Sequence, residues 1–315
     1  MVGGPGPGVV SGGHRRGLGP SDARAVRADV LGGQVMPYRG SRSGVPYADW
    51  SWNPVTGCTP ISRACEHCWA RGMLGRGLPG LGHDPDGPPV QVHPERLEAP
   101  RHWRSHRTVT VSFMGDWLHD DVPTPFIYEC LSAMAAAPAG TRFLTLTKRP
   151  ERLHRILDPM SGMREHLPIG EVRVLMERLW IGISVEDQVT MDHRLARLRV
   201  MEWPLTWISA EPLLERVDLL PAGPSEACEG LRRHVGWVVV GCERMGSNRV
   251  GRPFDPEWAR ALRDQCLAAR ADRGPRFYYK QGPSMHDPRI VEDLPELDGR
   301  QWTETPWERG AGVEC

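Results

Sequence analysis

The sequence predicts an α/β fold, built as a full or partial TIM-like (βα) barrel of parallel strands. Short apolar or β-branched runs repeatedly end in a polar residue and lead into segments whose apolar residues recur at helical intervals. This alternation of strands and helices is typical of a parallel sheet, and six or seven such units form a barrel more readily than an open sheet. The run 237–240, Trp-Val-Val-Val, is apolar throughout, as expected for a strand buried on both faces.

The predicted elements follow in chain order. One strand enters the loop that carries Cys58, and the others are expected at 109–113, 142–147, 179–184, 205–209, 236–240 and 276–279. A helix at 124–136 follows the turn-forming Asp-Val-Pro. A second helix, at 256–271, places Trp258, Leu262 and Cys266 at helical spacing.

The barrel is expected to occupy residues 46–286 as one domain that includes the cysteine loop. Residues 1–45 are dense in Gly, Pro, Ser and Arg without apolar periodicity, which predicts a disordered leader or a mis-called start, with Met36 as the alternative start. Residues 287–315 form a polar C-terminal tail, with Trp302 and Trp307 as its expected docking points.

Composition excludes several broad classes of protein. The chain has 39 Lys plus Arg and 39 Asp plus Glu, so no global field attracts nucleic acid or an anionic membrane. No apolar run reaches the roughly 20 residues that cross a bilayer, and the N-terminus lacks the apolar core of a secretory signal. We therefore expect no membrane partner and a cytoplasmic location.

Three of the eight cysteines, Cys58, Cys65 and Cys68, lie within eleven residues in a C-x6-C-x2-C spacing. Thiolates on such a loop can chelate one soft metal centre, and three ligands leave one iron of a [4Fe-4S] cluster open. A structural zinc site needs four ligands, which His67 or His83 could complete. An iron-sulfur cluster is the favoured prediction, zinc is the alternative, and three unligated buried cysteines are the remaining possibility.

Polar residues close nearly every predicted strand. Active-site groups gather at the carboxyl ends of parallel strands, so these residues are expected to meet on one rim. The residues expected on this rim include Lys148, Glu211, Glu243 and Lys280, which we predict to be catalytic, together with Met114, Gly115, Asp116, Ser184 and Glu186. Lys148 and Lys280 are the only lysines, which makes them informative because arginine cannot supply a compact ammonium of adjustable pKa. The simpler interpretation is that these residues mark where strands meet solvent.

Several motifs resemble one known family. They are Trp-Asn-Pro-Val-Thr-Gly-Cys (52–58), Asp-Trp-Leu-His-Asp-Asp-Val-Pro (116–123), Leu-Thr-Lys-Arg-Pro-Glu-Arg-Leu (146–153), Ile-Gly-Ile-Ser-Val-Glu (181–186), Glu-Pro-Leu-Leu (211–214) and Asp-Gln-Cys (264–266). The chain is similar to phage-associated proteins of unknown function with a three-cysteine motif, which resemble a divergent branch of radical S-adenosylmethionine enzymes. The resemblance implies a radical-SAM-like partial (βα) barrel with the [4Fe-4S] loop after its first strand, and a three-cysteine-motif partner protein.

The resemblance also implies roles for particular residues. The open iron would bind S-adenosylmethionine, whose reductive cleavage yields a 5′-deoxyadenosyl radical. Met114, Gly115 and Asp116 would receive the amino group of this cofactor, and Ser184 with Glu186 would meet its ribose. The first cysteine gap is wider than usual for radical enzymes, and Glu66-His67 replaces the usual aromatic residue before Cys68, for which Trp69 could compensate. Cys242, where relatives tend to have glycine, is neutral drift, an extra thiol or a fourth ligand.

Three functions follow, in order of preference. The first is a radical enzyme that acts on a nucleotide, a nucleic acid or a phage-encoded product. The second is a zinc- or cluster-stabilised nucleic-acid-binding or interaction module, in which the arginine-rich stretches 101–107 and 148–155 contact phosphates. In an arginine-biased chain these stretches are also read as solvated helix faces. The third is a hydrolase or nuclease that binds divalent ions through Asp116, Glu186, Glu211 and Glu243.

Overall fold

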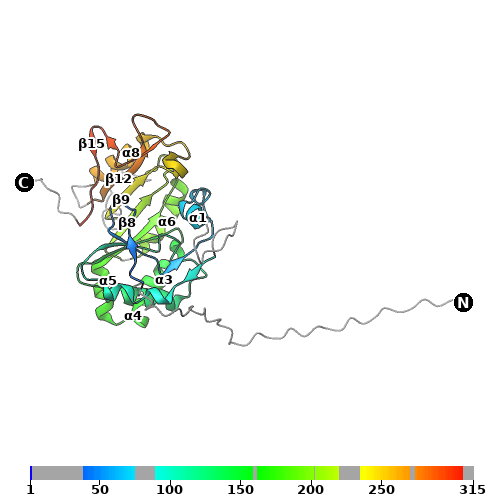
Figure 1. Ribbon diagram of the computed structural model, residues 1–315, viewed down its shortest axis with the longest axis vertical. Coiled ribbons are helices and arrows are strands. Elements are labelled where there is room, and N and C mark those ends of the chain that lie inside the picture. Colours follow the sequence, from blue (N-terminus) through cyan, green and yellow to red (C-terminus); the bar gives the residue numbers. More distant parts are fainter. Residues whose placement is uncertain are drawn as a thin grey trace, which may run out of the picture. The chain divides into compact units, whose positions relative to one another are not determined.

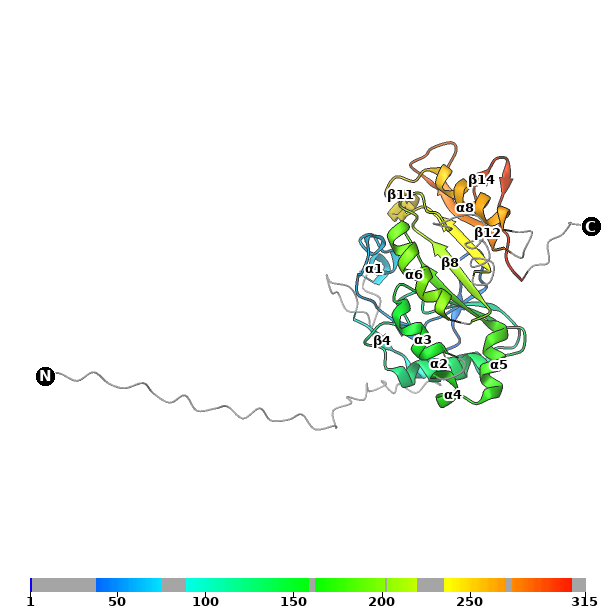
Figure 2. The same cartoon turned by 180° about the vertical axis from the view of Figure 1, so that it is seen from behind.

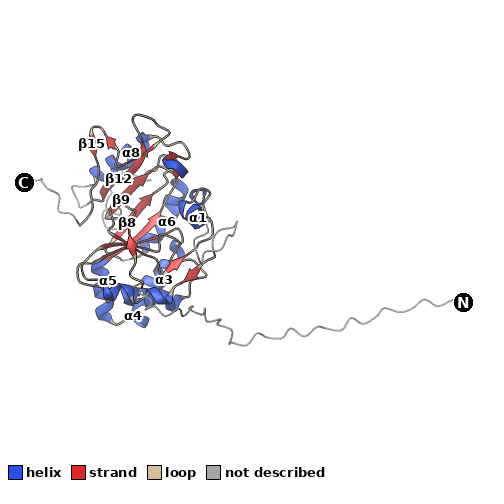
Figure 3. Cartoon of the chain, in the orientation of Figure 1, coloured by secondary structure: helices blue, strands red, loops and turns tan. Residues whose placement is uncertain are grey.

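The computed structural model describes Met1 and residues 38–74, 89–158, 162–201, 203–219, 235–269 and 274–307. In this part of the chain, nine strands form one sheet in the order β1-β2-β5-β6-β7-β8-β9-β12-β13 (Figures 1 and 3). Most of the predicted leader, together with His83 and the end of the tail, lies outside the described residues.

The sheet is mostly parallel. Six parallel pairings join seven consecutive strands of this order: β2 (Trp50–Trp52), β5 (Thr108–Val111), β6 (Arg142–Thr147), β7 (Leu179–Ser184), β8 (Thr206–Ala210), β9 (Trp237–Gly241) and β12 (Arg276–Pro283). Each new strand adds on the same side, as in a barrel. The sheet ends in the antiparallel strands β1 (Ser41–Arg42) and β13 (Val291–Asp293). The predicted α/β class and parallel sheet are confirmed, whereas closure into a full barrel is not seen among the described strands.

The helices connect successive strands. They are α1 (Trp69–Leu74), α2 (Thr124–Ala135), α3 (Leu153–Leu157), α4 (Gly162–His166), α5 (Ile169–Arg178), α6 (Gln188–Val200) and α8 (Pro256–Ala268). The helices predicted at 124–136 and 256–271 are confirmed as α2 and α8. A capping box of Asp187 and Thr190 starts α6, and the Asp255 side chain caps α8. Figure 2 shows α6 and α8 lying in front of the sheet, on the face turned away in Figure 1.

Side chains alternate between two cores along each strand, as the period of two in a β-strand requires. On β6, Phe143 packs in the larger core beneath the helices, and the next residue, Leu144, packs on the opposite face. The opposite face carries a smaller cluster that includes Trp180, Trp207 and Trp237. Its other members are Tyr47, Leu144, Val239 and Tyr278. The sheet is thus buried on both faces, as the apolar runs predict.

Close packing of the smaller cluster depends on one glycine. A Cβ atom on Gly182 would lie 2.4 Å from the indole Nε1 of Trp207, which is too close for any side chain. The indole occupies that space and donates a hydrogen bond of 3.1 Å to the carbonyl oxygen of Thr145. Tyr47 packs edge-on against Trp237, with ring centroids 4.8 Å apart. These aromatic residues fill one end of the sheet face that lies opposite the helices, and they leave the other end of that face open.

The chain on both sides of the predicted domain also joins the fold. β1 pairs with β2 before residue 46, and β13 pairs with β12 after residue 286. Trp302 is 8% exposed, and the ring of Trp307 lies 5.2 Å from that of Trp237, so both tryptophans dock as predicted. Two-stranded pairings add β3 (Val55–Thr56) with β4 (Gln91–Val92), β10 (Arg244–Met245) with β11 (Arg249–Val250), and β14 (Glu296–Leu297) with β15 (Arg300–Gln301). None of the described helices has the length and apolar character to cross a membrane.

Candidate functional site

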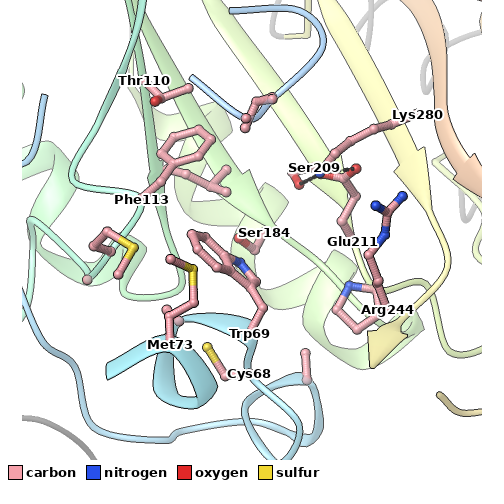
Figure 4. A pocket seen from close by; sticks show the side chains of 18 of the residues that line it. Cys68, Trp69, Met73, Thr110, Phe113, Ser184, Ser209, Glu211, Arg244 and Lys280 are labelled. Carbon is pink, nitrogen blue, oxygen red and sulfur yellow. Dashed lines mark hydrogen bonds and ion pairs between the residues drawn. The ribbon is translucent and has the colours of Figure 1, made fainter. Parts of the chain in front are cut away.

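A cavity of about 620 Å³ opens at the carboxyl ends of the parallel strands (Figure 4). Its size falls in the range of roughly 300–1,000 Å³ that small-molecule sites occupy. The alternation of the strands explains its lining, because Ser209 lies two residues beyond Trp207 on the same face of β8, and Glu211, directly after the strand, continues on that side. Lys280 likewise lies two residues beyond Tyr278 on β12. The cavity is therefore the open end of the face that the aromatic cluster fills.

Eleven of the twelve predicted site residues line this cavity. They are Cys58, Cys65, Cys68, Met114, Gly115, Asp116, Lys148, Ser184, Glu211, Glu243 and Lys280. Glu186 does not line it. The Glu186 side chain is buried, and its Oε2 accepts a 2.7 Å hydrogen bond from Arg194 on α6. Strand β7 ends at Ser184, and Asp187 already caps the next helix, so the alternation that places Ser184 in the cavity does not extend to Glu186.

The cysteine loop is fastened to the loop after β5. The backbone N–H of Gly57 donates a 3.0 Å hydrogen bond to the carbonyl of Met114, and Gly57 and Gly115 form an isolated parallel bridge. A Cβ atom on Gly115 would lie 2.6 Å from the Gly57 carbonyl oxygen, so only glycine permits this approach. Gly115 therefore allows a close backbone approach, and its partner is the cysteine loop itself.

A buried carboxylate and a buried guanidinium hold the first cysteine. Asp116 is 4% exposed and accepts hydrogen bonds from Thr147 Oγ1 (2.8 Å) and from Arg149 (3.3 Å). Its two oxygens also accept from the backbone N–H groups of Leu118 (3.1 Å) and Lys148 (3.0 Å). Both oxygens therefore accept hydrogen bonds from protein groups, so Asp116 holds neighbouring segments of the chain together.

Arg149 carries the anchoring into the cysteine loop. Its Nη1 lies 3.2 Å from Cys58 Sγ, and its Nη2 donates to the carbonyl and hydroxyl oxygens of Thr59 at 2.9 and 2.8 Å. Burial raises the pKa of the Cys58 thiol and Asp116 adds to the rise, while Arg149 offsets part of it. In this conformation the Cys58 thiol is a neutral group held beside a cation. Arg149 was not predicted as a site residue, although it directly follows Lys148.

A second ion pair holds the other end of the loop. Glu243, 5% exposed, accepts hydrogen bonds from Arg252 Nε (3.0 Å) and from the Arg252 backbone N–H (3.0 Å), and its Oε2 lies 3.0 Å from His67 Nδ1. Arg252 also donates to the carbonyl of Arg63 (3.0 Å) and to Glu66 (3.3 Å). Burial alone raises the pKa of Glu243, but the hydrogen bonds from Arg252 and His67 outweigh burial and place that pKa below its ordinary value. Glu243 is thus a charged clamp on the cysteine loop.

Across the cavity, Glu211 and Lys280 form an ion pair. Lys280 Nζ lies 3.2 and 3.3 Å from the two carboxylate oxygens of Glu211, and Ser209 Oγ donates to the same carboxylate at 3.2 Å (Figure 4). A Cβ atom on Gly241 would lie 3.0 Å from Glu211 Oε1, so this glycine leaves room for the carboxylate. The pair presents a carboxylate and an ammonium to one side of the cavity.

The mouth of the cavity carries exposed apolar side chains. Trp69 is 52% exposed at the start of α1, and Met73 is 41% exposed one turn later. Figure 4 shows both side chains pointing into the space between α1 and Phe113. Trp69 directly follows Cys68, so an indole lies beside the last cysteine, as the sequence predicts.

The thiols share the cavity without a formed metal site. Among the described residues, no group of three or more His, Cys, Asp or Glu side chains is arranged to hold a metal ion. Burial raises the pKa of Cys65, but the charge of Lys148 and hydrogen bonds from Ile61 and Ser62 outweigh it and lower the pKa below that of an ordinary thiol. Burial raises the pKa of Cys242, which also lines the cavity, to about 12.

Comparison with known proteins assigns a family. No curated protein and no solved structure matches the chain. One family model, described as a protein of unknown function (DUF5131), matches residues 42–309. The match spans the whole parallel sheet, the cysteine loop and the strands after β12. The chain therefore belongs to the DUF5131 family of proteins of unknown function.

Proposed function

We propose that this protein is an iron-sulfur enzyme of the radical S-adenosylmethionine type that acts on a nucleotide or nucleic-acid substrate. One observation carries the proposal: Cys58, Cys65 and Cys68 face the same cavity as both lysines, at the carboxyl ends of consecutive parallel strands. Catalytic groups of barrel enzymes gather at that end of the sheet. The supporting resemblance to radical enzymes comes from the sequence motifs.

The donor set fits a cluster that is held by three thiolates. Cys58, Cys65 and Cys68 would be the ligands, and Cys242 also lines the cavity but lies outside the cysteine loop, directly after β9. His67 is half exposed and hydrogen-bonded to Glu243, which gives it a role other than completing a zinc site. When bound, a [4Fe-4S] cluster with one open iron would supply the electron for reductive cleavage of S-adenosylmethionine.

The residues of the chain would orient and shield that chemistry. Asp116 with Arg149, and Glu243 with Arg252, hold the two ends of the cysteine loop. Ser184 and Gly115 line the cavity, where they would contact the cofactor. Trp69 covers the mouth of the cavity, where it would exclude water and oxygen.

The substrate would bind on the side of Glu211 and Lys280. The carboxylate accepts hydrogen bonds and the ammonium donates them, so together they match the donor and acceptor edge of a nucleobase. Phe113 and Leu146 add apolar lining beside them. Lys148 lies on the cysteine side, where its charge lowers the pKa of Cys65.

The structure does not favour the carboxylate-metal hydrolase. Each of its four proposed ligands already has a cationic partner: Asp116 with Arg149, Glu186 with Arg194, Glu211 with Lys280 and Glu243 with Arg252. Breaking a buried pair to free a carboxylate costs about 3–5 kcal/mol. The implied three-cysteine-motif partner protein stays an expectation, which co-purification from the native host tests.

Anaerobic reconstitution with iron and sulfide tests the proposal. The wild-type chain should gain a charge-transfer band near ~400 nm and iron in the ratio of a [4Fe-4S] cluster. Alanine at Cys58, Cys65 or Cys68 should abolish the band, whereas the control variant Cys242→Ser should keep it. The reduced protein should then convert S-adenosylmethionine to 5′-deoxyadenosine. Stoichiometric zinc with no iron would instead support the zinc-stabilised module, and no bound metal would refute both.

A further inference from the structure

A second cavity, of about 570 Å³, lies at the opposite end of the sheet from the cysteine loop. It is lined by Arg42, Ser43, Ala48, Asp49, Trp50, Ser105, His106 and Arg107. Trp50 is the first residue of β2, and residues 105–107 directly precede β5, so the cavity sits at the amino ends of these two parallel strands. It is separate from the site proposed above, and nothing in the first cavity accounts for it.

Arg107 is fixed in place without using its buried donor. Its guanidinium carbon lies 4.3 Å from the ring centroid of Trp50, a cation-π distance. The indole is itself held, because Trp50 Nε1 donates a 2.8 Å hydrogen bond to the carbonyl of Arg39. The Nε of Arg107 is buried, and within the described part of the chain it has no hydrogen-bond partner. A guanidinium that is fixed on an indole in the wall of a cavity is suited to binding an oxyanion.

The rest of the lining has the same character. Arg42 is exposed, and its backbone pairs with Trp50 in the β1–β2 ladder, which brings a second guanidinium to the cavity. Ser43, Ser105 and His106 add groups that can donate hydrogen bonds. The carboxylate in the lining, Asp49, accepts a 2.8 Å hydrogen bond from the backbone N–H of Thr108. Among the described residues, no ion pair joins an acid to Arg42 or Arg107, so the cavity keeps its positive charge.

Further basic side chains continue along the chain from this cavity. Arg101, which pairs with Glu98 at 3.4 Å, and His102 end a 3-10 helix, Ala99–His102, and Arg104 is exposed between that helix and the cavity. The chain as a whole has no net charge, so this is a local basic strip and not a general excess of cations. A strip of this kind beside an anion cavity suits a linear polyanion more than a single small ion.

We infer that this cavity binds a phosphate group, with Arg107 and Arg42 as its main ligands, and that the phosphate belongs to the backbone of a nucleic-acid strand. Arg107 supplies the fixed planar fork that phosphate recognition uses. The basic strip extends the contact to neighbouring phosphates. The inference is independent of the metal site, because none of these residues lines the first cavity.

The inference is tested by the binding of a labelled single-stranded oligonucleotide to the full chain. Fluorescence anisotropy measures this binding at two salt concentrations. Arg107→Gln and Arg42→Gln should each weaken binding about tenfold and reduce the salt slope by about one. Arg107→Lys keeps the charge but loses the fork and should give an intermediate affinity. The matched control is Arg300→Gln, since Arg300 also stacks on an indole, 4.2 Å from the ring centroid of Trp302, but lines neither cavity.

Inorganic phosphate distinguishes the two sources of the anion. Competition by phosphate only at concentrations far above that of the oligonucleotide supports a nucleic-acid strand, whereas binding of phosphate alone, with the same dependence on Arg107, identifies the free ion. If neither probe binds, or if Arg300→Gln weakens binding as much as Arg107→Gln, the inference is wrong. Thermal unfolding of each variant shows whether it is folded. If Arg107→Gln does not fold, Arg42→Gln still tests the inference.

Discussion

Replacing Asp116 with asparagine removes one charge from the anchor of the cysteine loop and changes almost no volume. The amide oxygen can still face Lys148 N–H and Arg149, which leaves the amide nitrogen toward Leu118 N–H and the Thr147 hydroxyl. The hydroxyl can turn to accept, but Leu118 N–H loses its acceptor at a cost of about 1–3 kcal/mol.

The larger effect is electrostatic. Arg149 is 7% exposed and loses the carboxylate that compensates its charge, and breaking such a buried pair costs about 3–5 kcal/mol. The two effects overlap, so we expect Asp116→Asn to lower the free energy of unfolding by about 3–5 kcal/mol in total. That is a large share of the roughly 5–15 kcal/mol that stabilises a typical domain.

Denaturant unfolding followed by tryptophan fluorescence and circular dichroism measures this loss, with coincident transitions as the check on two-state behaviour. Asp121→Asn is the matched control in the same loop. Asp121 is 74% exposed and lies 3.6 Å from His119, so its removal should cost no more than about 1 kcal/mol. If Asp116→Asn unfolds at the wild-type midpoint but no longer binds S-adenosylmethionine, Asp116 is a cofactor ligand and the anchor interpretation is refuted.

Three further predictions follow from the same cavity. In the metal-free protein at about pH 8, iodoacetamide should alkylate Cys65 at least about tenfold faster than Cys242, because the pKa of Cys65 is lowered and that of Cys242 is about 12. Peptide mass spectrometry measures both rates. Faster labelling of Cys242 would contradict the prediction that Cys65 is the more reactive thiol. Lys280→Ala should abolish turnover and destabilise the fold through the unpaired Glu211, and adding Glu211→Gln should restore the unfolding midpoint without restoring turnover. Trp69→Ala should change the free energy of unfolding by less than about 0.5 kcal/mol, because the side chain is half exposed. The same variant should shorten the lifetime of the reconstituted cluster in air, measured as the decay of absorbance near ~400 nm. An unchanged lifetime would show that Trp69 does not shield the cluster.

Local pattern was sufficient to predict most of the fold. The strands predicted at 142–147 and 179–184 match β6 and β7 at both ends, because their apolar runs are bounded by turns and polar residues. The boundaries at 45 and 286 were less well predicted. β1 and β13 are strands of only two or three residues, which is too short for the alternation of side chains to reveal them.

The residues of the candidate site could be predicted where the alternation of side chains between the two sheet faces continued past the end of a strand. Glu211 directly follows β8 and keeps to the cavity side, whereas Glu186 comes after β7 has ended and pairs with a helix. Arg252 gave no local signal, because its contact with Arg63 spans 189 residues of sequence.

By itself, the sequence determined the parallel α/β sheet, the polar carboxyl ends of its strands and a loop of three closely spaced thiols, since each depends on the order of neighbouring residues. The tertiary structure decided which partner each polar group has and which groups reach the cavity. It paired Asp116, Glu186 and Glu243 with arginines, left the two lysines and Glu211 on the cavity wall, and stacked Arg107 on Trp50 at the other end of the sheet. Charge pairing depends on distance in space, and only the folded chain brings these residues within range of one another.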